Sequence, residues 1–128
     1  MKKVAARLLL TCMASLALLA FRPGPANGPE IPDEVNQVLK HSCFDCHSNS
    51  AKKKVPKAAL NFDKWDSYKA TKKISKLDGI CKTVENNKMP PEKYVNDNPG
   101  KALSADQKRV LCEWAKKESE SLMEGVDE

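Results

Sequence analysis

The chain has 128 residues, of which 41% are hydrophobic, 30% are charged and 5% are aromatic. This length corresponds to a single domain. The formal net charge is +5, but four of the 22 basic residues and no acidic residue lie within positions 1–26, so the rest of the chain is close to neutral. Its lysines are not interleaved with arginines and aromatic residues, which argues against nucleic-acid binding.

The N-terminus has the pattern of an export signal. Lys2, Lys3 and Arg7 precede an apolar stretch at 8–21 that is short for a permanent membrane span. We therefore expect a signal peptide at 1–26, a single mature domain at 27–128, and a periplasmic or otherwise exported protein. Retention of 1–26 as an uncleaved anchor is the alternative, and only in that case would the protein be attached to a membrane.

Helical periodicity predicts three main helices, in chain order. Ile31, Val35, Val38 and Leu39 share one face of a first helix that runs into Cys43. Residues 49–63 lack a clear period and contain a proline, which predicts a loop.

The remaining two helices lie in the second half of the chain. Apolar residues at helical spacing predict a helix over roughly 66–87, followed by a loop at 90–103 that is rich in Pro, Asn and Gly. Ser104 and Gln107 form a capping-box pattern, which predicts the start of a last helix. No alternating stretch predicts a strand, so we expect an all-α fold.

Cys43, Cys46 and His47 form the pattern C-x-x-C-H, which is typical of covalent haem c attachment. Two thiols on one helical turn can meet the two vinyl groups of one haem, and the adjacent imidazole then lies below the iron. A thioredoxin-like motif would need a βαβ context, and zinc would need a second close pair of ligands, which Cys81, Cys112 and His41 do not form. A plain disulfide between Cys43 and Cys46 would leave His47 unexplained.

Met89 is the leading candidate for the sixth iron ligand. It follows the second predicted helix and precedes Pro90 and Pro91, whose fixed dihedrals can hold a thioether in place. A sulfur ligand of this kind favours ferrous iron and raises the reduction potential. His41 lies on the segment leading to the proximal side, so we expect it at the surface or beside a haem propionate.

Cys81 and Cys112 each lie near the apolar face of a predicted helix. Because an exported compartment is oxidising, we expect a disulfide between them. The alternative is that Cys81 binds iron as a thiolate, which would lower the reduction potential and favour a sensor over a carrier.

The chain resembles the small haem-binding domain family of exported bacterial cytochromes. The stretches that carry the resemblance are VLKHSCFDCHSN (38–49), LNFDKW (60–65), ISKLDGICKTVENNKMPPEKY (74–94) and LSADQKRVLCEWA (103–115). The resemblance implies a small cytochrome c-like helical domain wrapped around one covalent haem, with Met89 as the distal ligand. The sequence departs from the family where a tryptophan-rich segment is replaced by KKKVPKAA and where His-Pro is replaced by Asn98-Pro99.

These observations together predict that residues 27–128 form a haem c-binding domain. We expect the protein to be a monohaem c-type cytochrome that acts in periplasmic one-electron transfer. Residues 52–88 carry eleven lysines against four acidic residues, which suits an acidic redox partner or another cytochrome. The alternative function is a haem protein that binds or senses NO or CO at an open or Cys81-ligated sixth position. We expect no enzyme activity, because no distal histidine is available for peroxidase chemistry.

Overall fold

The computed structural model of the protein describes residues 30–125, and within this range it contains helices and no strand. The predicted all-α fold is therefore confirmed. The elements are, in chain order, α1 (Asp33–Ser42), α2 (Phe44–His47), α3 (Lys54–Ala59), the 3-10 helix η1 (Phe62–Ser67), α4 (Ala70–Glu85), α5 (Glu92–Asp97), the 3-10 helix η2 (Pro99–Lys101) and α6 (Ala105–Glu124).

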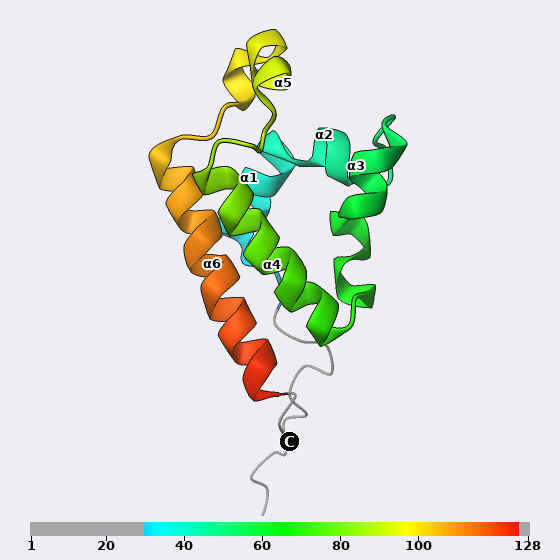
Figure 1. Ribbon diagram of the computed structural model, residues 1–128, viewed down its shortest axis with the longest axis vertical. Helices are drawn as coiled ribbons and strands as arrows, with labels where there is room; N and C mark the ends of the chain where they lie inside the picture. The colour runs from blue at the N-terminus through cyan, green and yellow to red at the C-terminus, as the bar shows by residue number, and fades with distance from the viewer. Residues whose placement is uncertain (1–29, 126–128) are drawn as a thin grey trace, which may run out of the picture.

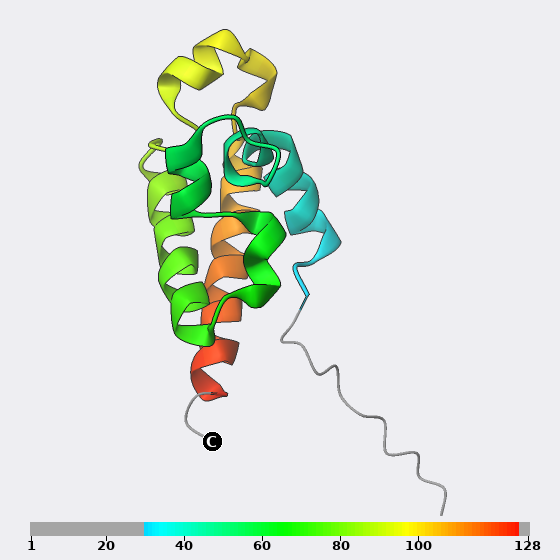
Figure 2. The ribbon, with the colours of Figure 1, turned by 90° about the vertical axis from the view of Figure 1, so that its right-hand side faces the viewer.

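Helices α4 and α6 form the body of the molecule. They run side by side in opposite directions, and α1 packs against α6 (Figures 1 and 2). Cys81 on α4 and Cys112 on α6 are joined by a disulfide with an Sγ–Sγ distance of 2.05 Å, as the sequence predicts. Helices α2 and α3 lie beside one end of this pair, and α5 projects beyond the same end.

The core lies between α1, η1, α4 and α6. Its buried apolar residues come from all four elements and are Val35, Val38, Leu39, Phe62, Trp65, Leu77, Ile80, Val84, Leu111, Trp114 and Ala115. Trp65 from η1 is only 2% exposed, and its ring centroid lies 5.7 Å from that of Trp114 on α6. This contact fixes η1 against the body of the molecule.

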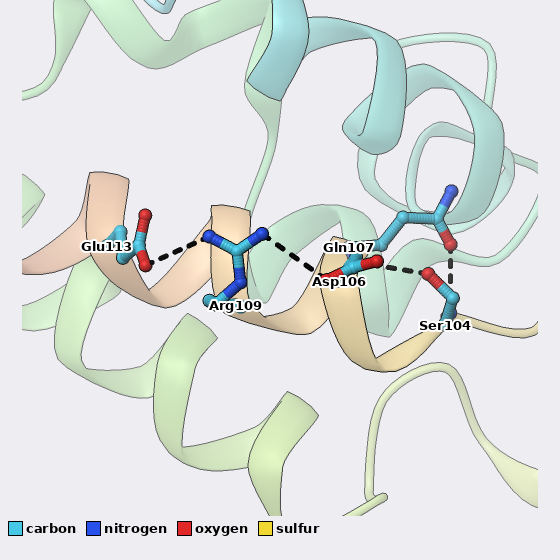
Figure 3. Close-up of polar contacts among 5 residues, drawn as sticks. All are labelled: Ser104, Asp106, Gln107, Arg109 and Glu113. Carbon is cyan, nitrogen blue, oxygen red and sulfur yellow. Dashed lines mark hydrogen bonds and ion pairs between the residues drawn. The ribbon is translucent and has the colours of Figure 1, made fainter.

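Helix α6 begins at the predicted capping box. The Ser104 Oγ accepts a hydrogen bond from the Gln107 backbone N–H at 3.1 Å, and the Gln107 Oε1 accepts one from the Ser104 N–H at 2.9 Å. One turn later, Arg109 forms ion pairs with Asp106 at 3.3 Å and Glu113 at 3.2 Å (Figure 3). The capping contacts satisfy backbone donors that a helix start leaves free.

Two segments predicted as loops contain helices, so these predictions are wrong in detail. Residues 49–63 include α3 and the start of η1, and residues 90–103 include α5 and η2. The loop prediction for 49–63 rests partly on Pro56. This proline is the third residue of α3, where a backbone N–H would have no acceptor within the helix, so its absence costs no hydrogen bond. Short helices of this kind contain too few turns for a period to be recognised.

The second main helix also begins later than predicted. Residues 66 and 67 belong to η1, Tyr68 and Lys69 are extended, and α4 starts at Ala70. No helix in residues 30–125 is both long enough and apolar enough to cross a membrane. The predicted signal peptide at 1–26 lies outside the described residues.

Candidate functional site

A cavity of about 300 Å³ lies at the end of the molecule where α1, α2, α3, α4 and the segment after α4 meet. Its inner wall is apolar and includes Leu39, Phe62, Ile80, Val84 and Leu103. Cys43, Cys46, His47 and Met89 all line it as well. The fold therefore brings four residues that the sequence analysis selected to one apolar cavity, although Met89 is far from the others in sequence.

His47 is held by backbone carbonyls of the α3 region. Its Nδ1 lies 3.0 Å from the Pro56 carbonyl oxygen and 3.1 Å from that of Leu60. Carbonyl oxygens only accept hydrogen bonds, so Nδ1 carries the proton and donates it. The lone pair then lies on Nε2, which is the arrangement that a metal-ligating imidazole requires.

Cys43 lies in the turn between α1 and α2, and Cys46 lies in α2 itself. Cys43 and Cys46 are partly buried, and neither is in a disulfide with any described residue. Burial and, to a smaller extent, the neighbouring Cys46 raise the pKa of Cys43 to about 12. A thiol redox enzyme needs a thiolate with a lowered pKa, so this environment argues against that function.

Met89 is positioned by the end of α4. Asn87 has a positive φ of 55°. The Lys88 N–H donates to the Thr83 carbonyl at 2.8 Å, and the Asn87 N–H donates to the Val84 carbonyl at 3.2 Å. These are the two hydrogen bonds of a Schellman motif, which stops a helix and turns the chain away from its axis.

Met89 follows this motif directly and lines the cavity. The Met89 N–H also lies 3.2 Å from the Thr83 carbonyl, and the Met89–Pro90 peptide bond is cis. The Met89 side chain is 37% exposed, so the protein alone does not enclose its thioether. The thioether is thus available to whatever occupies the cavity.

Polar groups occur at several points of the cavity lining. Ser42 is buried, and its Oγ has no hydrogen-bond partner among the described residues. Lys53 and Lys93 contribute exposed ammonium groups. A buried hydroxyl without a partner is costly, so it is expected to bond to a polar group on the occupant of the cavity or to a water.

Tyr94 on α5 also lines the cavity, and its hydroxyl donates a hydrogen bond to the carboxylate of Asp45. This hydrogen bond, ahead of the nearby charge of Lys101, holds the pKa of Asp45 below its usual range. Burial and the same hydrogen bond raise the pKa of Tyr94 to about 12. Asp45 lies between the two cysteines of the motif, so the contact joins the motif to the segment after Met89.

A family model described as a haem-binding domain matches residues 54–117, which is half of the chain. The chain belongs to this haem-binding domain family. The matched segment starts after the C-x-x-C-H motif and includes Met89 and both disulfide cysteines. No curated protein and no solved structure matches the chain.

The residues that line the cavity fit a haem. The two thiols and the imidazole lie on α2 and the residue that precedes it, the imidazole is held with its Nε2 free, and the inner wall is apolar. An apolar wall suits the porphyrin ring, and Ser42 and the two lysines offer polar partners to its propionates. The haem-binding assignment of the family and the chemistry of the cavity therefore agree.

Some residues considered in the sequence analysis lie elsewhere. His41 is exposed and does not line the cavity, and its Nε2 lies 2.6 Å from the Gly100 carbonyl oxygen. Cys81 does not line the cavity either, and its sulfur is bonded to Cys112, so the structure does not support an iron-bound thiolate at this position.

The contacts that support the site are not predictable from the sequence. Nothing in the residue types of α3 identifies the Pro56 and Leu60 carbonyls as partners of His47, because any residue supplies a carbonyl. The KKKVPKAA segment, which departs from the family, therefore still supports His47. Tyr94 lies in one of the stretches that resemble the family, but only the structure shows that it contacts Asp45.

Proposed function

We propose that the protein is an exported monohaem c-type cytochrome that carries single electrons between periplasmic redox partners. Haem c is attached through thioether bonds to Cys43 and Cys46, with His47 and Met89 as axial ligands. The observation that carries this proposal is that all four side chains line one apolar cavity. The disulfide between Cys81 and Cys112 supports an oxidising compartment.

Each residue has a defined part in this proposal. The bound haem supplies a one-electron ferric–ferrous couple. His47 donates its Nδ1–H to the Pro56 and Leu60 carbonyls, which orients the ring and increases the basicity of Nε2. The Met89 thioether favours the ferrous state and so raises the potential. The apolar wall excludes water from the haem and so also raises the reduction potential.

The lysines at the cavity lining suggest where a partner docks. Lys53 and Lys93 are exposed and line the cavity, so an acidic partner drawn to them would approach the cofactor closely. Lys73, which the sequence analysis counted among the lysines of 52–88, is only 6% exposed and cannot contribute. We expect electron exchange with an acidic partner to slow as ionic strength rises.

The covalent link is tested by extracting the denatured holoprotein with acidified organic solvent. Haem that is bonded to Cys43 and Cys46 stays with the chain, and a Cys43→Ala/Cys46→Ala variant loses it. Release of haem from the wild-type chain would contradict the proposal.

The axial ligand is tested by the weak near-infrared absorption band of ferric haem that carries a methionine ligand. We expect the band in the wild-type protein and in Met123→Ala, which changes an exposed methionine near the end of α6. Met89→Ala should abolish the band and lower the potential. A band that persists in Met89→Ala would show that another residue binds the iron.

One observation favours a second function, reversible binding of NO or CO. Met89 also lines a neighbouring cavity of about 200 Å³, together with Val95, Leu103 and Lys108. A thioether that leaves the iron has space to enter this cavity and would open the sixth position. Rapid CO binding by the ferrous wild-type protein, at a rate close to that of Met89→Ala, would favour this function over electron transfer.

We propose a carrier and not an enzyme. Within residues 30–125, His47 is the histidine that lines the cavity, and the ring of His41 is directed to Gly100 instead. Peroxidase chemistry uses a distal acid–base group, which this arrangement does not provide. Turnover with hydrogen peroxide at an enzymatic rate would overturn this part of the proposal.

A further inference from the structure

Three side-chain contacts join the segment 92–101 to the C-x-x-C-H region. The Tyr94 hydroxyl donates to the Asp45 carboxylate, and the Lys101 ammonium lies 3.4 Å from the same carboxylate. Close by, the His41 Nε2–H donates to the Gly100 carbonyl at 2.6 Å. We call these contacts the Asp45 clasp.

Little else attaches this segment to the molecule. No residue of α5 or η2 is buried, and none belongs to the hydrophobic core or packs against it. The backbone hydrogen bonds of the segment are local, such as those from Val95 N–H to the Pro91 carbonyl and from Lys101 N–H to the Asn98 carbonyl. Helix α5 accordingly projects from the end of the α4–α6 pair (Figure 1). Segments with few buried contacts open at low free-energy cost.

The clasp connects two walls of the same cavity. One wall carries Cys43, Cys46 and His47, with Asp45 between the cysteines. The other carries Met89 and continues into α5, where Tyr94 also lines the cavity. The Schellman motif fixes the chain just before Met89 and the capping box fixes it again at Ser104, so the clasp provides the contacts between these two points.

We propose that Asp45, through Tyr94 and Lys101, is a positioning residue that holds the segment after Met89 closed over the cavity and thereby keeps Met89 on the haem iron. This inference rests on the proposed function, in which Met89 is the axial ligand. Asp45 touches neither the iron nor its ligand in this role. It acts on the lifetime of the iron–methionine bond, because the thioether leaves when the segment opens.

The hydrogen bond from Tyr94 to Asp45 contributes more free energy to the clasp than the ion pair between Lys101 and Asp45. The Asp45 and Lys101 side chains are 52% and 31% exposed, and ion pairs with this exposure contribute little. Tyr94 as a whole residue is half-buried, and the hydrogen bond from its hydroxyl to an ionised carboxylate is of the stronger, charge-assisted kind. Tyr94→Phe therefore isolates the main contact, and it does so without a change next to the haem cysteines.

The test measures how fast imidazole replaces Met89 in the ferric holoprotein. At saturating imidazole, the rate is limited by opening of the segment and loss of the thioether. We expect Tyr94→Phe to accelerate replacement about tenfold, as loss of one charge-assisted hydrogen bond implies. Asp45→Ala should accelerate it at least as much, and the double variant should be no faster than Asp45→Ala, because both changes remove the same bond.

Asp106→Asn is the matched control. It removes an exposed carboxylate that pairs with Arg109 at the start of α6, away from the cavity, and should leave the rate unchanged. A second readout does not depend on the iron ligand: amide hydrogen exchange in 92–101 should become faster in Tyr94→Phe and Asp45→Ala, while exchange in α6 stays the same.

The possible outcomes separate the two proposals. If Met89→Ala removes the methionine band and the clasp variants match wild type in imidazole rate and hydrogen exchange, the clasp proposal is overturned and the ligand assignment stands. If Met89→Ala leaves the band unchanged, the ligand assignment fails, and the clasp proposal fails with it. Faster replacement in all clasp variants, with additive effects in the double variant, would also contradict a single clasp.

Discussion

At the scale of single residues, a few side chains decide where the chain turns toward the cavity. Asn87 is the clearest case. Its φ of 55° lies in the left-handed region, which asparagine and glycine adopt at lower cost than other residues. The turn places Met89 beside the cavity, so a local backbone preference has a direct consequence for the site.

Substitution of Asn87 should separate backbone strain from side-chain bonding. Its Oδ1 accepts a hydrogen bond from the Lys108 ammonium, and both Asn87→Ala and Asn87→Gly remove this contact. Because alanine is strained at positive φ, Asn87→Ala should lose about 1 kcal/mol of unfolding free energy relative to Asn87→Gly. Chemical denaturation of both variants measures the difference, and equal stabilities would contradict this account.

Glu118 is a buried acid outside the site. It is 6% exposed, and its Oε1 has no hydrogen-bond partner among the described residues. Burial raises the pKa of Glu118, and the positive charge of Lys73 opposes the increase without cancelling it. A raised pKa in the folded state means that folding favours the protonated acid. Stability is therefore lost as the pH rises above the ordinary range of a glutamic acid.

Glu118→Gln should remove the free-energy cost of burying the ionised carboxylate. Below about pH 4 the acid is largely protonated in both states, so the difference between variant and wild type reflects only the change of side chain. Toward pH 7, stability should shift in favour of the variant, because wild type then carries a poorly solvated carboxylate. Urea unfolding at both pH values provides the measurement. A shift in favour of wild type would indicate that attraction to Lys73 outweighs burial.

At the scale of elements, the α4–α6 pair is the stable frame on which the site is built. The two helices share the core and the disulfide, whereas α2, α3 and α5 are short helices of four, six and six residues attached around one end. Helices of this length are not stable alone in water. Their positions therefore depend on the frame, on the contacts with His47 and Asp45, and on the bound cofactor.

Removal of the disulfide should weaken this frame. The bond closes a loop with a sequence separation of 31 residues, which corresponds to about 3–4 kcal/mol in the chain-entropy model. We expect Cys81→Ala/Cys112→Ala to lose free energy of unfolding on this scale. Denaturation of both proteins, with and without a thiol reductant, measures it. Wild type should respond to the reductant and the variant should not; equal stability without reductant would contradict the estimate.

At the scale of the whole molecule, the core and the cavity overlap only in part. Val35, Trp65, Leu77, Leu111 and Trp114 are core residues that do not line the cavity. The half of the molecule away from the cavity therefore has its own buried contacts. The end that holds the cavity has an apolar wall that is covered only when a ligand is bound.

This division predicts how the haem-free chain behaves. It should keep helical circular dichroism and slow amide exchange in α4 and α6, and it should lose protection in 43–62 and 89–103. The reason is that these two segments face the cavity and contribute only Phe62 to the buried residues of the hydrophobic core. Hydrogen-exchange mass spectrometry of the chain with and without haem makes the comparison. Uniform loss of protection, including α4 and α6, would show that the α4–α6 pair does not stay folded without the cofactor.

The sequence by itself determined the helical class, the capping box at Ser104, the pairing of Cys81 with Cys112 and the candidate ligands. The helical class, the capping box and the C-x-x-C-H motif depend on periodicity or on residue types at short spacing, which the linear chain carries directly. The disulfide is predicted from two cysteines near apolar helix faces in an oxidising compartment, and Met89 from the two prolines that follow it. Only the tertiary structure decided that Met89 meets His47 at one cavity, that backbone carbonyls hold His47 and that Tyr94 reaches Asp45. Those contacts join residues distant in sequence or use carbonyl groups common to all residues, so their existence depends on how the helices pack.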